Sequence, residues 1–363
     1  SNSLLELIGA VENAAYDSNI KGIYLNFTGG SISLANIEEL RAALIRFKQQ
    51  SGKFIIAYNE YYGQMGYYLA SVADKVFINP EGGFSWQGMS SQVMFYKGLL
   101  DKLGVKAEIF RHGTFKSAVE PYIQDEMSDA NREQTQSYMD DIWSYWLSNI
   151  SESRHIPVEV LNEYADKYLG FYEADSIIKF GMADTLVYAT GIEPYLKGLT
   201  EIDSEDKLNL ATVNNMKGVE EEKKKKSKNE IAVLYAEGAI VMSDDNLDFM
   251  SGSTIAARKY ITELQKLKEN KDVKAVVIRV NSPGGSAYAS EQIWNAITEL
   301  KKEKPVIVSM GDFAASGGYY ISCAATSIVA EPTTLTGSIG IFGLLPEGEE
   351  LAKKMGVTFD EIT

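Results

Sequence analysis

The chain has 363 residues, with 35 Lys and Arg against 50 Asp and Glu, so its formal net charge is −15 and its sequence pI is about 4.8. This acidic balance argues against nucleic acid or an anionic membrane surface as the main partner. Hydrophobic residues make up 45% of the chain, which is enough for large cores, and the length predicts two or three domains. Because the chain has only two histidines and one cysteine, a structural zinc site is not expected.

The N-terminal residues Ser1-Asn2 resemble the remnant of an expression tag, and no signal-peptide pattern follows them. The sequence contains no apolar run of 18 residues or more, so we expect any membrane anchor to lie outside it. Cys323 has no partner for a disulfide within the chain. Its small apolar neighbours predict that it is buried and fills space in a core.

The first part of the chain alternates between strand and helix patterns. After an opening helix, a strand is predicted at 22–27, a glycine-containing turn at 28–31, a helix at 34–49 and a strand at 53–58. This β-α-β-α order favours a mainly parallel sheet covered by helices. Residues 128–172 are predicted to be rich in helix and aromatic side chains, which we interpret as helix packing.

The polar composition of residues 201–229 predicts a linker. Its run of four lysines, 223–226, follows three glutamates, 220–222, so we interpret it as a solvated linker and not as a lipid or nucleic-acid site. A new strand and turn are predicted at 231–242. A buried strand at 273–280 then leads through Asn-Ser-Pro-Gly-Gly-Ser into an amphipathic helix at 287–302.

The most informative stretch surrounds Ser316. A buried strand is predicted at 305–309, small residues surround the serine, and a helix is predicted at 319–325. A serine at the start of a helix lies among free backbone N–H groups, which can stabilise an oxyanion. The pair Gly284-Gly285 can present another N–H at the end of a strand. Two such elements side by side would supply a nucleophile and an oxyanion hole, as acyl transfer needs.

The two halves of the chain repeat each other. Gly66-Tyr67-Tyr68-Leu69-Ala70 matches the stretch Gly318 to Ser322 at an offset of 252, and Lys21 to Leu25 matches Lys274 to Ile278 at an offset of 253. In this alignment Gln64 stands opposite Ser316, and Trp86 stands opposite Ser338. The first copy therefore lacks the candidate nucleophile and is expected to serve as a scaffold.

The repeat predicts three regions: an N-terminal copy at 1–200, the polar linker at 201–229, and a C-terminal copy at 230–363 that lacks a helical portion present in the first copy. Residues 100–105 match residues 351–357 near the point where the sequence stops. These boundaries follow from internal similarity alone.

Three motifs in order, Asn281 to Ser286, Ala314 to Tyr320 and Leu335 to Gly340, resemble the signal peptide peptidase A family, also called protease IV, in its long two-repeat form. The segment Gly113 to Tyr122 is similar to the catalytic-lysine segment of that family. The resemblance implies an α/β fold of tandem duplicated Clp-protease/crotonase-like domains, with mainly parallel sheets covered by helices.

The resemblance also implies chemistry. Ser316 would be the nucleophile, Lys116 the general base, Ser338 the residue that orients the lysine, and the N–H groups of Gly317 with Gly284 or Gly285 the oxyanion hole. No cofactor is implied. The expected partners are hydrophobic peptides such as cleaved signal peptides and further copies of the chain, as a tetramer. The expected location is the periplasmic side of the bacterial inner membrane, with an anchor outside this sequence.

Alternatives remain open on the residues alone. A histidine, His112 or His155, could serve as the base, although no orienting acid is adjacent to either. Asp312, four residues before Ser316, does not fit a simple Ser-Lys site, because a carboxylate near Lys116 would favour the charged form of the lysine. A crotonase-type acyl-CoA enzyme or a nonenzymatic assembly scaffold would share the same fold.

Overall fold

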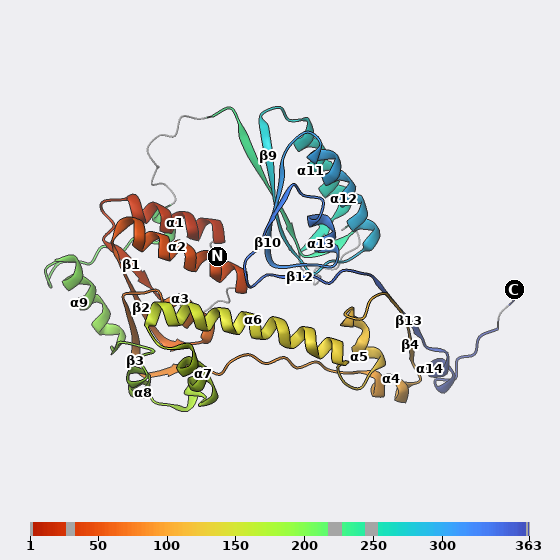
Figure 1. Ribbon diagram of the computed structural model, residues 1–363, viewed down its shortest axis with the longest axis horizontal. Coiled ribbons are helices and arrows are strands. Elements are labelled where there is room, and N and C mark those ends of the chain that lie inside the picture. Colours follow the sequence, from red (N-terminus) through yellow and green to blue (C-terminus); the bar gives the residue numbers. More distant parts are fainter. Residues whose placement is uncertain (1–2, 27–32, 217–226, 244–252, 361, 363) are drawn as a thin grey trace. The chain divides into compact units, whose positions relative to one another are not determined.

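The computed structural model describes residues 3–26, 33–216, 227–243, 253–360 and 362 (Figure 1). The chain forms two compact units. Unit 1 comprises Ser1–Met89, Ile142–Ser227 and Glu331–Thr333, and unit 2 comprises Ser90–Asp141, Lys228–Ala330 and Thr334–Thr363. A stretch of the first copy thus belongs to the unit that holds most of the second copy. The three regions predicted from the repeat, 1–200, 201–229 and 230–363, therefore remain a prediction about how the sequence was duplicated.

Unit 1 is built on a parallel sheet with strand order β1-β2-β3-β5. Its strands are β1 (Gly22–Leu25), β2 (Phe54–Tyr62), β3 (Lys75–Phe84) and β5 (Thr185–Leu186). Its helices are α1 (Leu4–Tyr16), α2 (Leu34–Ser51), α3 (Gln64–Ala70), α7 (Val158–Asp166), η2 (Leu169–Phe171), α8 (Ala174–Lys179), α9 (Ala189–Thr200) and α10 (Val213–Met216). The long helix α6 (Asp129–Arg154) runs from unit 2 into unit 1.

Helix α2 shows why these residues fold as they do. Its buried positions Ile37, Leu40, Leu44 and Phe47 recur at helical spacing and form one apolar face. The helix ends at Gly52, whose left-handed φ of 67° lets its N–H donate to the carbonyl of Lys48. The predicted end at residue 49 was therefore two residues short of the observed end.

A buried polar network joins α2, α3 and α6 within unit 1. The hydroxyl of Tyr68 and the indole N–H of Trp146 donate to Glu38, at 2.8 and 3.2 Å. Arg41 donates to the carbonyl of Tyr68 at 2.7 Å, and the ring of Trp146 stacks on that of Tyr68. Trp146, one of the aromatic residues of this region, thus packs helices together, whereas Tyr168 is 50% exposed.

Unit 2 contains a second parallel sheet, with strand order β11-β10-β9-β6 and β12 beside β10. Its strands are β6 (Glu230–Glu237), β9 (Val273–Ser282), β10 (Val306–Ala315), β11 (Ser327–Val329) and β12 (Leu335–Gly337), and β7 (Ala239–Val241) pairs separately with β8 (Thr254–Ala256). The helices α11 (Ala257–Glu269), α12 (Ala287–Lys301) and α13 (Gly317–Ser322) cover this sheet on one face (Figure 1). Together with unit 1, this arrangement confirms the predicted α/β class with mainly parallel sheets.

The core of unit 2 follows the period of a strand. Alternate residues of β9, Val276, Ile278 and Val280, are fully buried and contact α11 and α12, and the same holds for Val306 and Val308 of β10. Strand β10 continues to Ala315, well beyond the predicted end at 309. The prediction failed there because Gly311 and Asp312 carry no strand signal, whereas pairing of residues 313–315 with β12 continues the strand.

The remaining part of unit 2 is an antiparallel ribbon of β4 (Lys106–Arg111) and β13 (Phe342–Glu347). Short helices accompany it: α4 (Lys97–Leu103), η1 (Ser117–Val119), α5 (Glu120–Ile123) and α14 (Glu349–Lys354). The ribbon joins a strand of the first copy to a strand of the second copy.

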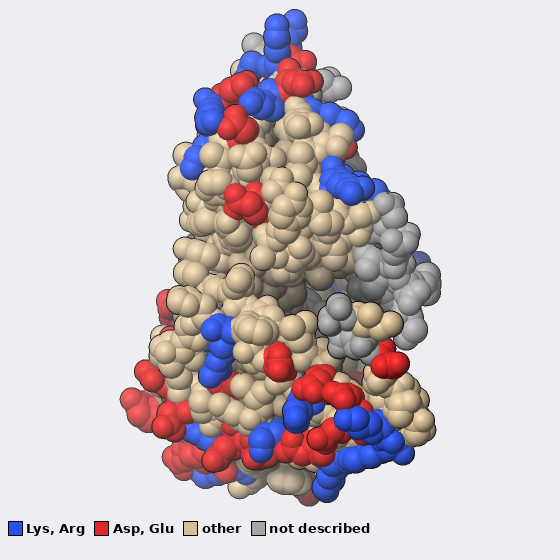
Figure 2. Space-filling model, turned by 90° about the vertical axis from the view of Figure 1, so that its right-hand side faces the viewer, with Lys and Arg blue, Asp and Glu red and all other residues tan. Residues whose placement is uncertain are grey.

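Charged side chains of both signs are intermixed on the face drawn in Figure 2, most densely over its lower part. The excess of acidic residues therefore does not gather into a field of one sign on this face. Among the helices that the structure describes, none has both the length and the apolar character needed to cross a bilayer.

Candidate active site

Ser316 lies at a sharp turn between β10 and α13. It is the N-cap residue of α13, with φ 54° and ψ −117°, a backbone conformation that non-glycine residues seldom adopt. Its N–H donates to the carbonyl of Gly337 at 2.9 Å, which ties the turn to β12. Strain of this kind persists only where the surrounding structure imposes it, and it occurs often at functional sites.

Glycines let two backbone segments meet at this turn. A Cβ on Gly284 would lie 2.7 Å from the N atom of Gly317 and 2.8 Å from the Cβ of Ser316. A Cβ on Gly317 would lie 3.2 Å from the N atom of Gly285, and one on Gly318 would lie 2.5 Å from the carbonyl of Ser282. The two glycine elements singled out in the sequence are therefore in direct contact.

Lys116 precedes η1 and is buried, with 4% of its surface exposed. Its Nζ lies 3.1 Å from the Oγ of Ser316, although 200 positions separate the two residues in the chain. The same Nζ lies 2.7 Å from the carbonyl oxygen of Ser338 and 3.1 Å from its Oγ. Burial lowers the pKa of the Lys116 ammonium below its usual value.

Ser338 lies directly after β12 and has a left-handed φ of 49°. Gly337 before it also has a positive φ, of 80°, so the backbone turns here and presents both the carbonyl and the hydroxyl of Ser338 to the lysine. The hydroxyl of Thr336 donates to the carbonyl of Ala314 at 2.7 Å and holds β12 against β10. The predicted lysine-orienting residue and the predicted base are thus adjacent.

A network around Glu120 anchors the segment that carries Lys116. Glu120 is fully buried, and it accepts hydrogen bonds from the N–H and hydroxyl of Ser128, at 3.2 and 2.6 Å, and from Asn131 at 3.0 Å. Arg111 contacts it at 3.5 Å. Burial alone would raise the pKa of Glu120, but these hydrogen bonds outweigh it and hold the pKa below its usual value. Sequence reasoning missed this network, for which Ser128 at the start of α6 was the available signal.

The backbone N–H groups near Ser316 differ in what they already bind. The N–H of Gly284 donates to the Oγ of Ser282 at 3.1 Å. The N–H of Gly317 belongs to the first turn of α13, where a helix has no carbonyl acceptor of its own. Of the predicted donors, Gly317 is therefore better suited to an oxyanion than Gly284.

A family model described as "Peptidase family S49" matches residues 47–203 and 298–363, which is more than half of the chain and includes Lys116, Ser316 and Ser338. The chain belongs to peptidase family S49. Among curated proteins it is 37% identical over 372 residues to Protease 4 of Haemophilus influenzae, covering 99% of this chain and 59% of that protein.

Two further relatives extend the comparison. The chain is 33% identical over 372 residues to the chloroplastic serine protease SPPA of Arabidopsis thaliana, covering 100% of this chain and 54% of that protein. It is also 38% identical over 135 residues to a putative signal peptide peptidase SppA of Enterococcus faecium, covering 36% of this chain and 38% of that protein. The chain thus spans somewhat more than half the length of the two S49 relatives that match it along its whole length.

The other candidates from the sequence lie elsewhere. His112 is exposed at the end of the β4 strand, and His155 is an exposed turn residue between α6 and α7, with a φ of 57°. Asp312 is buried within β10. Cys323, predicted to be buried, is exposed at the end of α13, so that prediction was wrong. The helix is only six residues long, and position 323 falls on its solvent side.

In unit 1 the positions equivalent to Ser316 and Ser338 hold residues of another kind. Gln64 begins α3, and its side-chain amide binds the backbone of residues 87 and 88: Oε1 accepts from both N–H groups, and Nε2 donates to the carbonyl of Gly88. Trp86 is completely buried and donates its indole N–H to the carbonyl of Leu161 at 2.9 Å. These side chains close the turn through packing and hydrogen bonds.

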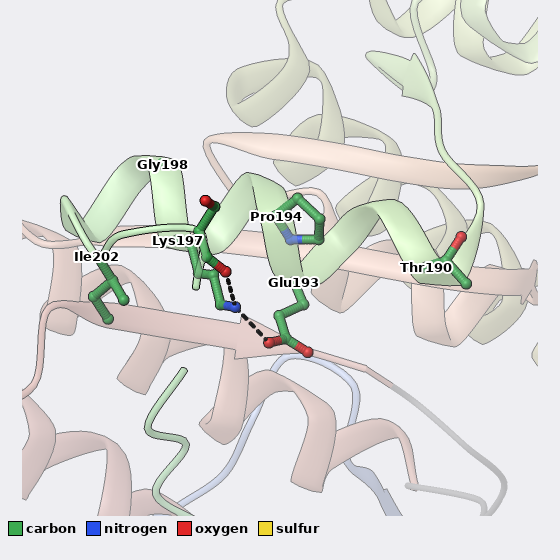
Figure 3. Close-up of a pocket in the computed structure, with 7 residues that line it drawn as sticks. Thr190, Glu193, Pro194, Lys197, Gly198 and Ile202 are labelled. Atoms are coloured by element: carbon green, nitrogen blue, oxygen red, sulfur yellow. Dashed lines mark hydrogen bonds and ion pairs between the residues drawn. The ribbon is translucent and has the colours of Figure 1, made fainter. Parts of the chain in front are cut away.

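Unit 1 also has a pocket of about 420 Å³ beside α9 (Figure 3). Seven residues line it: Thr190, Glu193, Pro194, Lys197, Gly198, Ile202 and Ser204. Lys197 pairs with Glu193 at 3.1 Å and donates to the carbonyl of Ser204 at 3.0 Å. The two charged side chains of this pocket thus pair with each other, and none of the predicted site residues lines it.

Proposed function

We propose that this chain is a serine endopeptidase in which Ser316 is the nucleophile and Lys116 the general base. The observation that carries the proposal is the 3.1 Å distance between Lys116 Nζ and Ser316 Oγ at a buried position. A serine hydroxyl needs an adjacent base, and lysine can act as one when burial favours its neutral form. Membership of a peptidase family and the printed names of the relatives support the same reaction class.

The contacts of Lys116 suit a neutral amine. A neutral amine has two N–H groups and one lone pair. Its N–H groups can donate to the carbonyl and hydroxyl oxygens of Ser338, which leaves the lone pair to accept the proton of the Ser316 hydroxyl. Ser338 thus orients the amine toward the nucleophile.

The reaction then proceeds in two stages. Ser316 Oγ bonds to the scissile carbonyl carbon while Lys116 takes the hydroxyl proton, and the N–H groups of Gly317 and Gly285 stabilise the oxyanion. Lys116 gives this proton to the leaving amine as the C–N bond breaks. Water next attacks the acyl-enzyme with Lys116 again as base, which releases the acid product and restores Ser316. None of these steps requires a cofactor.

Apolar peptides are the proposed substrates. Large apolar side chains next to the site residues in sequence are exposed in unit 2: Phe115 before Lys116, Phe313 before Ser316, and Ile339 and Ile341 after Ser338. Exposed apolar groups around a reactive centre favour apolar ligands. Remnants of signal peptides at the periplasmic face of a bacterial inner membrane fit this chemistry, in agreement with the resemblance seen in the sequence.

Covalent labelling tests the proposal. A fluorophosphonate probe should modify wild-type protein at Ser316, and Ser316→Ala should remove both the label and the hydrolysis of an apolar fluorogenic peptide. Ser309→Ala, on strand β10 that leads to the turn at Ser316, is the matched control and should keep both. Labelling of another residue, or peptide turnover by Ser316→Ala, would refute the assignment. Turnover of an acyl-CoA thioester without peptide cleavage would favour a crotonase-type enzyme instead.

A further inference from the structure

The short strand β7 pairs with the glycine pair Gly284-Gly285 as well as with β8. The N–H of Ile240 donates to the carbonyl of Gly284 at 2.9 Å, and the N–H of Ser286 donates to the carbonyl of Ile240 at 2.8 Å. These two bonds form a parallel bridge between Ile240 and Gly285. The backbone of Ile240 therefore fixes the glycine pair on both sides of Gly285.

This pairing sets the direction of the N–H of Gly285. In a planar trans peptide the carbonyl and the next N–H point in opposite directions. Because the carbonyl of Gly284 points toward β7, the N–H of Gly285 points away from β7 and is not used in the pairing. The N atom of Gly285 lies beside the turn at Ser316, 3.2 Å from where a Cβ on Gly317 would lie.

The side chain of Ile240 reaches the other proposed oxyanion donor. Ile240 is 1% exposed, and its Cδ1 lies 3.2 Å from the Cβ position of Gly317. The Oγ of Ser290, a fully buried residue of α12, lies 2.5 Å from the same position. Gly317 is thus closely packed against both side chains, and a shorter side chain at 240 would leave space beside it.

The position of Ser290 also depends on Ile240. The hydroxyl of Ser290 donates to the carbonyl of Ser286 at 2.9 Å. Ser286 is the N-cap of α12, and its Oγ accepts from the N–H of Ala289 at 3.3 Å. Since the N–H of Ser286 is bound by the carbonyl of Ile240, the start of α12 is held in place by β7.

We propose that Ile240 is a positioning residue for the oxyanion hole: its backbone directs the N–H of Gly285, and its side chain supports Gly317. The inference rests on the proposed function, because it concerns the oxyanion formed in the same acyl transfer. Ile240 is buried, so it acts through the two glycines and not on the substrate. Oxyanion donors stabilise charge that develops in the transition state, so their displacement lowers kcat and leaves KM unchanged.

The test compares Ile240→Ala with Ile255→Ala. Ile255 is the register partner of Ile240 on β8 and is 3% exposed, so both variants remove a buried isoleucine from one strand pair and should lower Tm. Only Ile240→Ala should lower kcat for an apolar fluorogenic peptide, by about 10- to 100-fold with KM unchanged, since small misplacements and lost oxyanion donors have effects of this order.

A peptide trifluoromethyl ketone gives a second readout. Its carbonyl carbon bonds to the Oγ of Ser316, and its oxygen becomes an oxyanion in a stable tetrahedral adduct. The inhibition constant of this ketone should rise in Ile240→Ala by the same factor as kcat falls, and it should stay at the wild-type value in Ile255→Ala.

A milder pair keeps the test decisive where an alanine variant fails to fold. Ile240→Val removes only the Cδ1 atom near Gly317 and should lower kcat less than Ile240→Ala does, whereas Ile255→Val should not lower it. Equal kcat in the variants at 240 and 255, or an effect on KM alone, would overturn the role of Ile240 while wild type still cleaves peptides and is labelled at Ser316. A wild-type protein that does neither would overturn the proposed function and this inference together.

Discussion

The Nζ atom of Lys116 makes the contacts on which the proposed chemistry depends. It contacts Ser316 and two oxygens of Ser338, and burial lowers its pKa. A group with a depressed ammonium pKa becomes neutral at a lower pH than a lysine in solvent. The fraction of enzyme with a competent base therefore increases as pH rises through the lowered value.

This gives a prediction for the pH dependence. The rate of peptide hydrolysis should rise with pH through an inflection below the usual lysine pKa of 10.5. Lys116→Arg should be nearly inactive at every pH tested, since a guanidinium does not lose its proton in this range. The measurement is a pH–rate profile of both proteins. An inflection near the histidine value of about 6.5 that vanishes in His112→Ala would instead assign the base to histidine.

Glu120 permits a second residue-scale prediction. Glu120→Gln would leave one acceptor oxygen where the carboxylate has two, so either the Ser128 N–H and the Asn131 amide, or the Ser128 hydroxyl and Arg111, would face an NH₂ group. We expect a loss of about 1–3 kcal/mol in the free energy of unfolding, as for other unsatisfied buried groups. We also expect a lower kcat with little change in KM, because the lysine segment loses its anchor. Urea denaturation and steady-state kinetics measure the two effects, with the exposed Glu126 as the control in Glu126→Gln.

The pH dependence of that loss has a defined sign. The pKa of Glu120 is lower in the folded protein than in the unfolded chain, where it is near 4.5. The ionised carboxylate therefore stabilises the folded protein fully above the unfolded pKa, and this stabilisation is lost as pH falls through the folded pKa. The difference in stability between wild type and Glu120→Gln should therefore shrink in acid. A difference that stays constant down to the acid transition would show that the carboxylate charge is not what the network stabilises.

At the scale of elements, the site depends on the end of β9 coming close to the turn between β10 and α13. Gly284→Ala should disrupt this approach, since its φ is 102° and the added Cβ would lie 2.7 Å from the backbone N of Gly317. We expect a cost of about 1–3 kcal/mol in stability, as for other strained backbone positions, together with loss of fluorophosphonate labelling. Gly348→Ala is the control, because nothing lies within 4 Å of that position. Normal labelling of Gly284→Ala would mean that the two elements need not touch.

Helix α3 of unit 1 begins with Gln64, where the equivalent helix of unit 2 is preceded by the nucleophile candidate Ser316. It has the same place in unit 1 that α13 has in unit 2, yet Gln64 uses its amide to bind the backbone of residues 87 and 88. Gln64→Ala should therefore leave peptide hydrolysis within a few-fold of wild type and lower the melting temperature of the protein slightly. Abolished hydrolysis in a folded, normally assembled variant would reveal a catalytic role for the first copy at this position.

At the scale of the whole molecule, the chain crosses between two units, and all candidate catalytic residues lie in unit 2. Unit 1 has its own core beneath α9, where Leu196 packs against Ile56, Tyr58 and Phe77. Leu196→Ala should cost about 2–5 kcal/mol, as for other large-to-small core changes. Below the melting transition it should leave the labelling rate of Ser316 unchanged. A proportional loss of labelling at low temperature would show that the units are coupled.

The sequence by itself was sufficient for the class of fold, the duplication and the three motifs. These features are local: strands show as apolar runs, turns as glycine pairs, and the copies as matching residues at nearly constant offsets. The same local signals identified Ser316 as a serine at a helix start. They failed at Cys323 and at the end of β10, because exposure and strand length depend on which elements pack against a segment.

Only the tertiary structure decided the environment of Lys116. Nothing in its neighbours along the chain requires burial, and 200 positions separate it from Ser316. The β4–β13 pairing, the turn at Ser338 and the network around Glu120 together bring the amine to the serine within one unit. Such contacts form between segments far apart in the chain, and their energies depend on distance and burial, which a sequence pattern does not contain.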